Sequence, residues 1–357
     1  MNPSSLIPTP DPIPVHWGWF QVFLLLTALV HFLIMNTMLG SGIIALISSV
    51  RGSRSDLKQA REISTKLPMA IAFTINLGVA PLLFIQVLYG HFFYTSSVLM
   101  AAYWISIIPI LILAYYGAYI YDFKFDALGS LRIVFIAAVV LLFLFIGFLF
   151  SSNATLMLTP EKWGKYVSTG TGTALRLFEP SLIFRYLHFV LASTAIGGLS
   201  LSLLSTTKYR KGDMDAEQTI LLGMKWFTHS TLTQIPIGVF FLISLPATIR
   251  SLFLGGDFAS TGLFAVGMAG VILSLILGLR IKVWPCTAST LFTVFVMVII
   301  RDLVRQAYLK PFFTPSSLEV NPQYGPLILF LAASAAGVTA VGFMIRLMLQ
   351  NKGEVRS

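Results

Sequence analysis

Cysteine and charge are both scarce in this chain. Cys286 is the only cysteine among 357 residues, and Asp, Glu, Lys and Arg together make up 11%. A single cysteine excludes a disulfide framework and any Cys-x-x-Cys site, and the absence of Cys-x-x-Cys-His excludes covalent c-type haem. Soluble proteins carry about 25% charged residues. With a mean hydropathy of +0.84, the composition predicts an integral membrane protein.

Positive charge is in excess, but it does not indicate nucleic-acid binding. The net charge is +10, and the basic residues gather in the segments between apolar runs. The first apolar run lacks the charged segment that precedes the core of a signal peptide, so we expect it to remain in the mature protein. We therefore expect this chain to contact membrane lipid and not nucleic acid.

Nine runs are apolar and long enough to cross a bilayer as helices, which takes about 20 residues each. They do not alternate with period two, which excludes a transmembrane barrel. The sequence thus predicts an all-α polytopic membrane protein. The nine runs lie at 18–48, 67–95, 98–121, 130–151, 180–205, 218–247, 261–280, 284–304 and 324–349.

Lys and Arg are unevenly distributed between the two sides of these runs. Fifteen follow the odd-numbered runs, eight lie on the opposite side, and Lys225 lies within a run. The positive-inside rule then places the N-terminus outside and the C-terminus in the cytoplasm. We expect the membrane to be a bacterial cytoplasmic membrane.

Two segments of the chain repeat each other. His31 to Gly40 lies in the first run and His188 to Gly197 in the fifth, and each has a threonine six residues after its histidine and a glycine nine after it. This repeat predicts two similar four-helix bundles with the ninth helix peripheral. The corresponding boundaries are 1–152 for the first bundle, 153–179 for an outer loop, 180–305 for the second bundle, 306–323 for another outer loop, and 324–357 for the ninth helix and tail.

The repeated histidines are the strongest functional signal. An imidazole inside a membrane is costly and marks a functional site, and haem iron is the simplest occupant of such a repeated site. At 1.5 Å per residue, His188 lies about 12 Å below the outer end of its span. Met268 is expected at the same depth in the seventh span, so the two would ligate one haem b. His31, deeper by this counting, would hold a second haem b.

The remaining candidates have both functional and ordinary interpretations. His91, near the outer end of the second span, is a candidate partner for His31, for a quinone or for a haem propionate. His229, in the middle of the sixth span, would ligate a third haem or bond to a haem edge. Arg185, Arg301 and Arg305 lie at a level suited to haem propionates. The ordinary interpretations are core packing, interfacial solvation and lipid-headgroup contact.

Several of these residues resemble a known family. Gln21 and the run from Thr27 to Leu33 are similar to the first helix of subunit I of the cytochrome bd quinol oxidases, and Gly78-Val79-Ala80 with Gly90 resembles that subunit's next characteristic stretch. Tyr186-Leu187-His188 and the run from Val266 to Gly270 stand where the family has the His and Met ligands of its low-spin haem b. The resemblance implies nine helices, an outer N-terminus, haem b and a quinone substrate.

The chain departs from the family where oxygen is reduced. The oxidases have glutamates within helices three and eight, whereas the carboxylates Asp122, Glu179, Glu217 and Asp302 here fall at span ends. The family's long outer loop between helices six and seven is reduced to residues 247–260. Because oxygen reduction consumes protons, we expect electron transfer alone.

The sequence therefore predicts a subunit that carries two haems b, or three with His229. It would pass electrons between a membrane quinone and a separate c-type cytochrome or other redox subunit on the outer face. The alternatives are a divergent bd-type oxidase, a secondary transporter without haem and a structural anchor.

Overall fold

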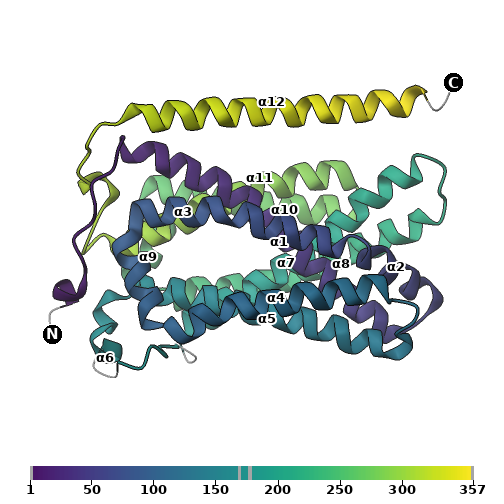
Figure 1. Cartoon of the computed structure of the whole chain (residues 1–357), viewed down its shortest axis with the longest axis horizontal. Coiled ribbons are helices and arrows are strands. Elements are labelled where there is room, and N and C mark those ends of the chain that lie inside the picture. Colours follow the sequence, from purple (N-terminus) through teal and green to yellow (C-terminus); the bar gives the residue numbers. More distant parts are fainter. Residues whose placement is uncertain (1–2, 168–169, 176–178, 355–357) are drawn as a thin grey trace.

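The computed structural model describes residues 3–167, 170–175 and 179–354, which form helices joined by short loops (Figure 1). The long helices are α1 (Trp17–Arg51), α3 (Leu67–Leu99), α4 (Ala101–Phe123), α5 (Arg132–Met157), α7 (Pro180–Tyr209), α8 (Ala216–Ser244), α10 (Phe258–Leu279), α11 (Val283–Leu309) and α12 (Tyr324–Glu354). The short helices are α2 (Arg54–Ser64), α6 (Gly164–Val167), α9 (Ala247–Ser251), a π-helix at Leu252–Gly256, and 3-10 turns at Pro3–Leu6, Gly129–Leu131, Pro160–Lys162 and Pro315–Ser317.

The helices have the length and composition of membrane spans. Within the described ranges, eight are long and apolar enough to cross a bilayer, and the number rises to nine if α8 is counted together with the bent segment that follows it. The prediction of an all-helical polytopic membrane protein is confirmed at this level. The sixth run does not continue straight to residue 247, because the chain bends by 120° between α8 and the segment Ala247–Gly256. Pro246 follows Leu245 at this bend, and a residue before proline is disfavoured in helical geometry.

Helix α1 lies at the centre of the packing and contacts α3, α5, α7 and α11. The contacts of the first four long helices are matched by those of the next four. Helix α1 packs on α3 as α7 packs on α8, and α4 packs on α5 as α10 packs on α11. Three contacts cross between the groups, from α1 to α7, from α5 to α7 and from α11 to α1.

The contact between α1 and α7 joins equivalent positions of the sequence repeat. A Cβ atom on Gly40 would lie 1.8 Å from the carbonyl oxygen of Ser193, and one on Gly197 would lie 2.5 Å from the carbonyl carbon of Gly40. The Ser193 hydroxyl donates to Asn36 Oδ1 at 2.7 Å. Asn36 and Ser193 both stand five residues after their histidine. Because only glycine permits such close backbone approach, the repeat is built into the crossing of these two helices.

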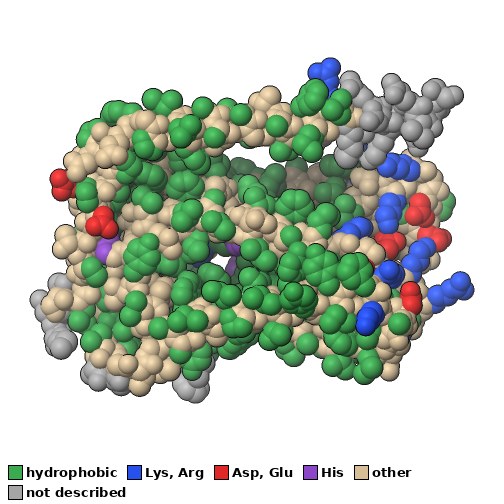
Figure 2. Space-filling view, viewed as in Figure 1, with side chains coloured by type: hydrophobic (Ala, Val, Ile, Leu, Met, Phe, Trp, Pro, Cys, Tyr) green, Lys and Arg blue, Asp and Glu red, His purple; other side chains and the backbone are tan. Residues whose placement is uncertain are grey.

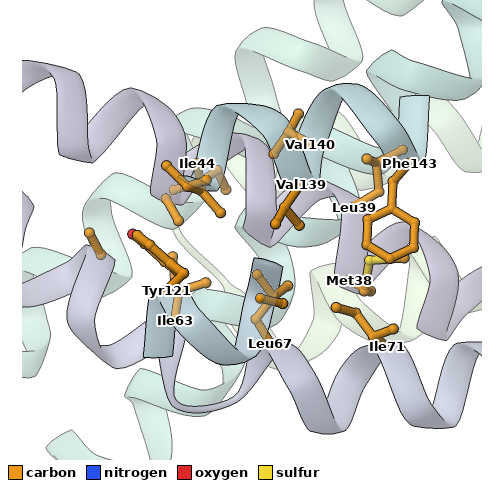
Figure 3. Close-up of a cluster of buried hydrophobic side chains, with 14 of the residues drawn as sticks. Met38, Leu39, Ile44, Ile63, Leu67, Ile71, Tyr121, Val139, Val140 and Phe143 are labelled. Atoms are coloured by element: carbon orange, nitrogen blue, oxygen red, sulfur yellow. The ribbon is translucent and has the colours of Figure 1, made fainter. Parts of the chain in front are cut away.

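The two ends of the helices differ in charge. Lys and Arg gather at the end that holds α2 and the loop between α7 and α8, which we call the basic end (Figure 2). A cluster of buried apolar side chains lies beneath α2 and joins it to α1, α3, α4 and α5 (Figure 3). Three ion pairs connect α2 to α4, to α7 and to the residue before α8. They are Arg61–Asp122 at 3.0 Å, Lys208–Glu62 at 2.8 Å and Lys58–Asp215 at 2.9 Å.

The opposite end, which we call the N-terminal end, is covered by loops. The backbone of Ile13 donates to Glu319 at 2.8 Å and accepts from Asn321 at 2.9 Å. These segments belong to a second apolar cluster that includes Phe92, Trp163 and Phe313. Helix α12 lies apart from the other helices in Figure 1. The aromatic contacts of its Phe330 join it to Phe23 of α1 and Phe84 of α3, at ring distances of 5.1 and 6.2 Å.

Candidate functional site

The two repeated histidines lie at the same level of the structure. His31 and His188 each precede, by nine residues or about 14 Å of helix, the glycine at which α1 and α7 touch. Counting from the predicted span ends made His31 the deeper residue, whereas the two histidines are equally spaced from the crossing. The counts differ because α1 starts fourteen residues before its histidine, while α7 starts eight before.

Each histidine ring faces a glycine on the next long helix. A Cβ atom on Gly78 of α3 would come within 2.8 Å of His31 Cε1, and one on Gly238 of α8 within 3.3 Å of His188 Cε1. Any larger residue at these two positions would push against the imidazole. The glycines therefore make room for the two rings in the same way.

His188 has one ring nitrogen paired and one unpaired. The side-chain amide of Gln234 meets His188 Nε2 at 3.1 Å, with the donor and acceptor roles set by the tautomer of the ring. The Nδ1 atom of His188 is buried and has no hydrogen-bond partner. Gln234 stands four residues before the glycine that faces the ring.

His31 is held in a corresponding way. Its ring contacts the backbone of Thr74, which stands four residues before Gly78. His31 Nδ1 is also buried without a hydrogen-bond partner. Unpaired buried polar atoms are rare and call for an explanation. Two buried imidazoles with incomplete hydrogen bonding are candidates for metal ligands, whose second ring nitrogen is commonly held by a hydrogen bond.

Arg301 lies near His31 and near two further arginines. The two are Arg185 and Arg305, and the Arg301 guanidinium stands 4.8 Å from the ring centre of Phe32. Arg185 donates to the carbonyl of Ser151 at 3.1 Å and to a nearby threonine hydroxyl, while its Nε has no partner. The sequence named all three as candidate partners for propionates; Arg301 lies near each of the other two, and their role stays a prediction.

The space beside these residues is open. Arg301 is an exposed residue. Figure 2 shows an opening between the helices, with hydrophobic side chains around it and histidine atoms at its edge. The described residues thus combine cationic groups, unpaired imidazoles and accessible apolar surface.

Asp302 is a site residue that the sequence analysis placed wrongly. It is 3% exposed and lies seven residues before the end of α11, which extends five residues beyond the predicted span. Its carboxylate accepts from Gln21 at 2.6 Å and Gln306 at 2.7 Å and pairs with Arg305 at 3.0 Å. The Arg305 guanidinium lies 5.3 Å from the ring centre of Tyr89. A carboxylate therefore does lie inside the helix assembly.

The other predicted ligands are not brought to the two histidines. His91 packs between Phe92 and Phe313, with ring distances of 4.3 and 4.5 Å. It stands thirteen residues beyond the glycine that faces His31, or about 20 Å along α3, too far for the two to share one iron. His229 is exposed on α8, and its Nδ1 meets the Lys225 carbonyl oxygen at 2.7 Å. Neither histidine lies beside His31 or His188 in this way, and their roles as ligands stay predictions.

Met268 is half-buried on α10, across from the helix of His188. Helix α7 packs on α8 and α11, and α10 packs on the same two helices. The pairing of Met268 with His188 across this group stays a prediction. Gly238 and Gln234 were not singled out in the sequence, although a glycine four residues after a polar residue in a membrane helix was a readable signal.

No family model matches this chain, and no curated protein is similar to it. The resemblance to the bd oxidases therefore stays a prediction carried by the residues quoted above. Among the residues described, no three His, Cys, Asp or Glu side chains come together as a metal-ion site. Haem iron differs from such an ion because the protein supplies only its axial ligands.

Proposed function

We propose that this chain is a haem b-carrying membrane subunit that passes electrons between a membrane quinone and a redox partner on the outer face. The N-terminal end is the outer face in this proposal, because the basic end fits the cytoplasmic side. The membrane would be a bacterial cytoplasmic membrane, and the partner a separate c-type cytochrome or similar subunit. The long helices would form two similar four-helix bundles with α12 peripheral.

One observation carries the proposal. His31 and His188 occupy equivalent places at one level, each faces a glycine, and each has a buried Nδ1 without a partner. An ordinary buried histidine would use both ring nitrogens. The duplication makes an accidental gap in hydrogen bonding a poor explanation, because it occurs twice, each time with a glycine facing the ring.

The residues of this chain fit haem b. His31 and His188 would each bind one iron, with Met268 as the second ligand beside His188. Arg185, Arg301 and Arg305 would hold the propionates, because guanidinium groups form strong paired hydrogen bonds with carboxylates. When bound, haem supplies reversible one-electron chemistry at its iron.

The surrounding residues would position and insulate this chemistry. Gln234 and the Thr74 backbone orient the two imidazoles, and the facing glycines leave the rings room. The apolar helix surfaces around the opening would lower the local dielectric, which strengthens the electrostatic effect of the arginines. The close crossing of α1 and α7 would keep the two haem sites near each other.

A redox difference spectrum of the purified chain, with pyridine haemochrome quantitation, tests the proposal. We expect two b haems per chain. His188→Ala should remove one low-spin signal and His31→Ala the other, whereas the control His229→Ala should retain both because that residue is exposed. A folded preparation without Soret absorbance, or an unchanged spectrum in both alanine variants, would contradict the assignment.

The buried carboxylate of Asp302 favours a second candidate, a divergent bd-type oxidase that reduces oxygen. The argument against oxygen reduction rested on a lack of interior acids, and Asp302 is such an acid. Carbon monoxide binding separates the two functions. A high-spin haem that binds carbon monoxide would favour the oxidase, and its absence would favour electron transfer alone.

A further inference from the structure

Helices α10 and α11 are joined by a tight reversal of the chain. The backbone N–H of Lys282 donates to the Leu277 carbonyl, and that of Ile281 donates to the Gly278 carbonyl, both at 3.0 Å. This pair of bonds is the Schellman arrangement, which ends a helix through one residue in left-handed geometry. That residue is Ile281, with φ of 55°. The reversal therefore holds Arg280 and Lys282 one residue apart at the end of the helix pair.

An apolar groove of about 590 Å³ runs between α10 and α11 on their exposed side. Ala269 of α10 and Ala288 of α11 are exposed small residues in its lining, which is apolar apart from Ser289. Along α10 the groove extends from Val266 to Leu277, which is eleven residues or about 16 Å of helix. Half of a hydrocarbon core about 30 Å thick is about 15 Å. The groove therefore has the length of one lipid leaflet.

Three basic residues lie at the end of the groove nearest the reversal. Arg280 stands three residues after the last groove residue of α10, which puts it on the same side of that helix. Lys282 stands three residues before the first groove residue of α11. The third is Arg210 at the end of α7, whose guanidinium lies 5.7 Å from the ring centre of Trp284. Cationic groups therefore border one end of an otherwise apolar groove.

These three cations differ from others at the basic end, where three ion pairs neutralise a lysine or an arginine. Among the described residues, no ion pair includes Arg210, Arg280 or Lys282. All three side chains are exposed. Neighbouring charges of one sign attract a ligand of the opposite sign. The end of the groove is therefore suited to an anionic group.

A bilayer determines what kind of occupant such a groove takes. Lipid chains are as apolar as the groove, so no hydrophobic driving force favours one lipid over another. An acyl chain in the groove restores the van der Waals contacts that its walls lack. Selectivity then comes from the headgroup, because the charge lies at the groove's end. Basic pockets between membrane helices bind anionic headgroups in this way.

We propose that the groove and its three cations form a binding site for one anionic phospholipid. An acyl chain lies between Ala269 and Ala288, and the phosphate lies beside Arg280 and Lys282. Trp284 lies at the headgroup level, where the amphipathic ring of tryptophan is favoured. The site uses none of the residues proposed to hold haem, so the site and the proposed function can fail separately.

Native mass spectrometry of the purified chain tests the site with two lipids that have the same acyl chains. We expect one phosphatidylglycerol to bind at least about tenfold more tightly than zwitterionic phosphatidylcholine, since each nearby basic residue contributes about fivefold. Arg280→Gln combined with Lys282→Gln should abolish most of this preference. The control is Arg54→Gln combined with Lys124→Gln. It removes the same charge from α2 and from the end of α4, which pack on other helices, and it should retain the preference.

Filling the groove tests the place of the acyl chain. Ala288→Phe puts a ring into the groove and should remove the bound phosphatidylglycerol while the headgroup cations stay in place. Ala138→Phe is the matched control, because Ala138 is exposed on α5 at a similar distance from the start of its helix. Ala269→Phe blocks the groove from the facing helix if Ala288→Phe does not fold.

Several results would overturn the site. One is equal affinity for the two lipids in the unchanged chain, and another is a preference that survives the Arg280→Gln and Lys282→Gln changes. Undiminished binding in both groove variants would show that the headgroup binds without the groove. A photoreactive label on Ala288→Cys, in a Cys286→Ala background, should crosslink to phospholipid in membranes. Crosslinking to a protein instead would assign the groove to a partner helix.

Discussion

The crossing of α1 and α7 gives the sharpest prediction about stability. Gly40→Ala adds a single methyl group where its carbon would lie 1.8 Å from the carbonyl oxygen of Ser193. Ordinary van der Waals contact begins at about 3.4 Å. The obstacle is backbone, which cannot rotate aside as a flexible side chain would. The two helices must therefore separate at their closest point.

The magnitude follows from two opposing effects. Overpacking a tight contact costs about 1–3 kcal/mol, and a backbone obstacle puts this substitution at the upper end. Replacing a helical glycine by alanine returns up to about 1 kcal/mol through reduced backbone entropy. We expect the free energy of unfolding to fall by about 2 kcal/mol. Gly262→Ala is the matched control, because a Cβ there meets nothing within 4 Å.

The single cysteine provides the assay. Cys286 is fully buried, so its thiol reacts with a maleimide fluorophore only when the helices separate. Labelling on heating should begin at a lower temperature in Gly40→Ala than in the unchanged chain, and Gly262→Ala should match the unchanged chain or exceed it.

The equivalent substitution on α7 makes the test stricter. Gly197→Ala meets the same contact from the other side, so the first methyl group already provides the separation that the second would require. The double variant should lose less stability than the two single losses added together, by about 1 kcal/mol. Additive losses, or a Gly40→Ala variant as stable as Gly262→Ala, would refute the proposed backbone contact.

Three further predictions concern charge and space. Arg305→Leu should lower stability by about 3–5 kcal/mol because it leaves a buried carboxylate unpaired, and Asp302→Leu combined with it should restore part of the loss in thermal unfolding. Gly78→Ala, whose Cβ would lie 2.8 Å from the ring of His31, should displace one haem signal in the difference spectrum and leave the other unchanged. The pKa of Asp215 is lowered by its lysine partner, so the pair contributes above the ordinary carboxyl pKa and its contribution disappears as the pH falls through the lowered value. Because the pair is exposed, Asp215→Asn should change the acid unfolding midpoint only slightly.

Much of the fold could be predicted from hydropathy because a bilayer leaves a chain few choices. Backbone groups must be satisfied within each span, so the apolar runs became long helices in the described part of the chain. The bend after α8 was missed because the apolar run continues through Leu245 and Pro246. Helix α2 was also missed, since a short amphipathic helix between spans has the composition of a polar loop.

The candidate site was predictable in its residue types and unpredictable in its geometry. The repeated histidines and three arginines were found because buried polar residues are rare in membrane helices. Asp302 was assigned to the end of a span because the end of α11 was predicted five residues too early. A shift of that size is more than one helical turn, which is enough to make a buried acid look like an interfacial one. The exposed position of His229 depends on which way α8 is rotated, and the apolar residues on all sides of that helix do not reveal it.

The contact between Gly40 and Gly197 has the form of an interface between two copies of one protein. The same position of each half touches its counterpart, as in a self-complementary dimer, where one patch meets itself. In a single chain with this feature, as in such a dimer, a substitution at the shared contact affects both halves at once. The residues at the contact therefore cannot vary independently of each other.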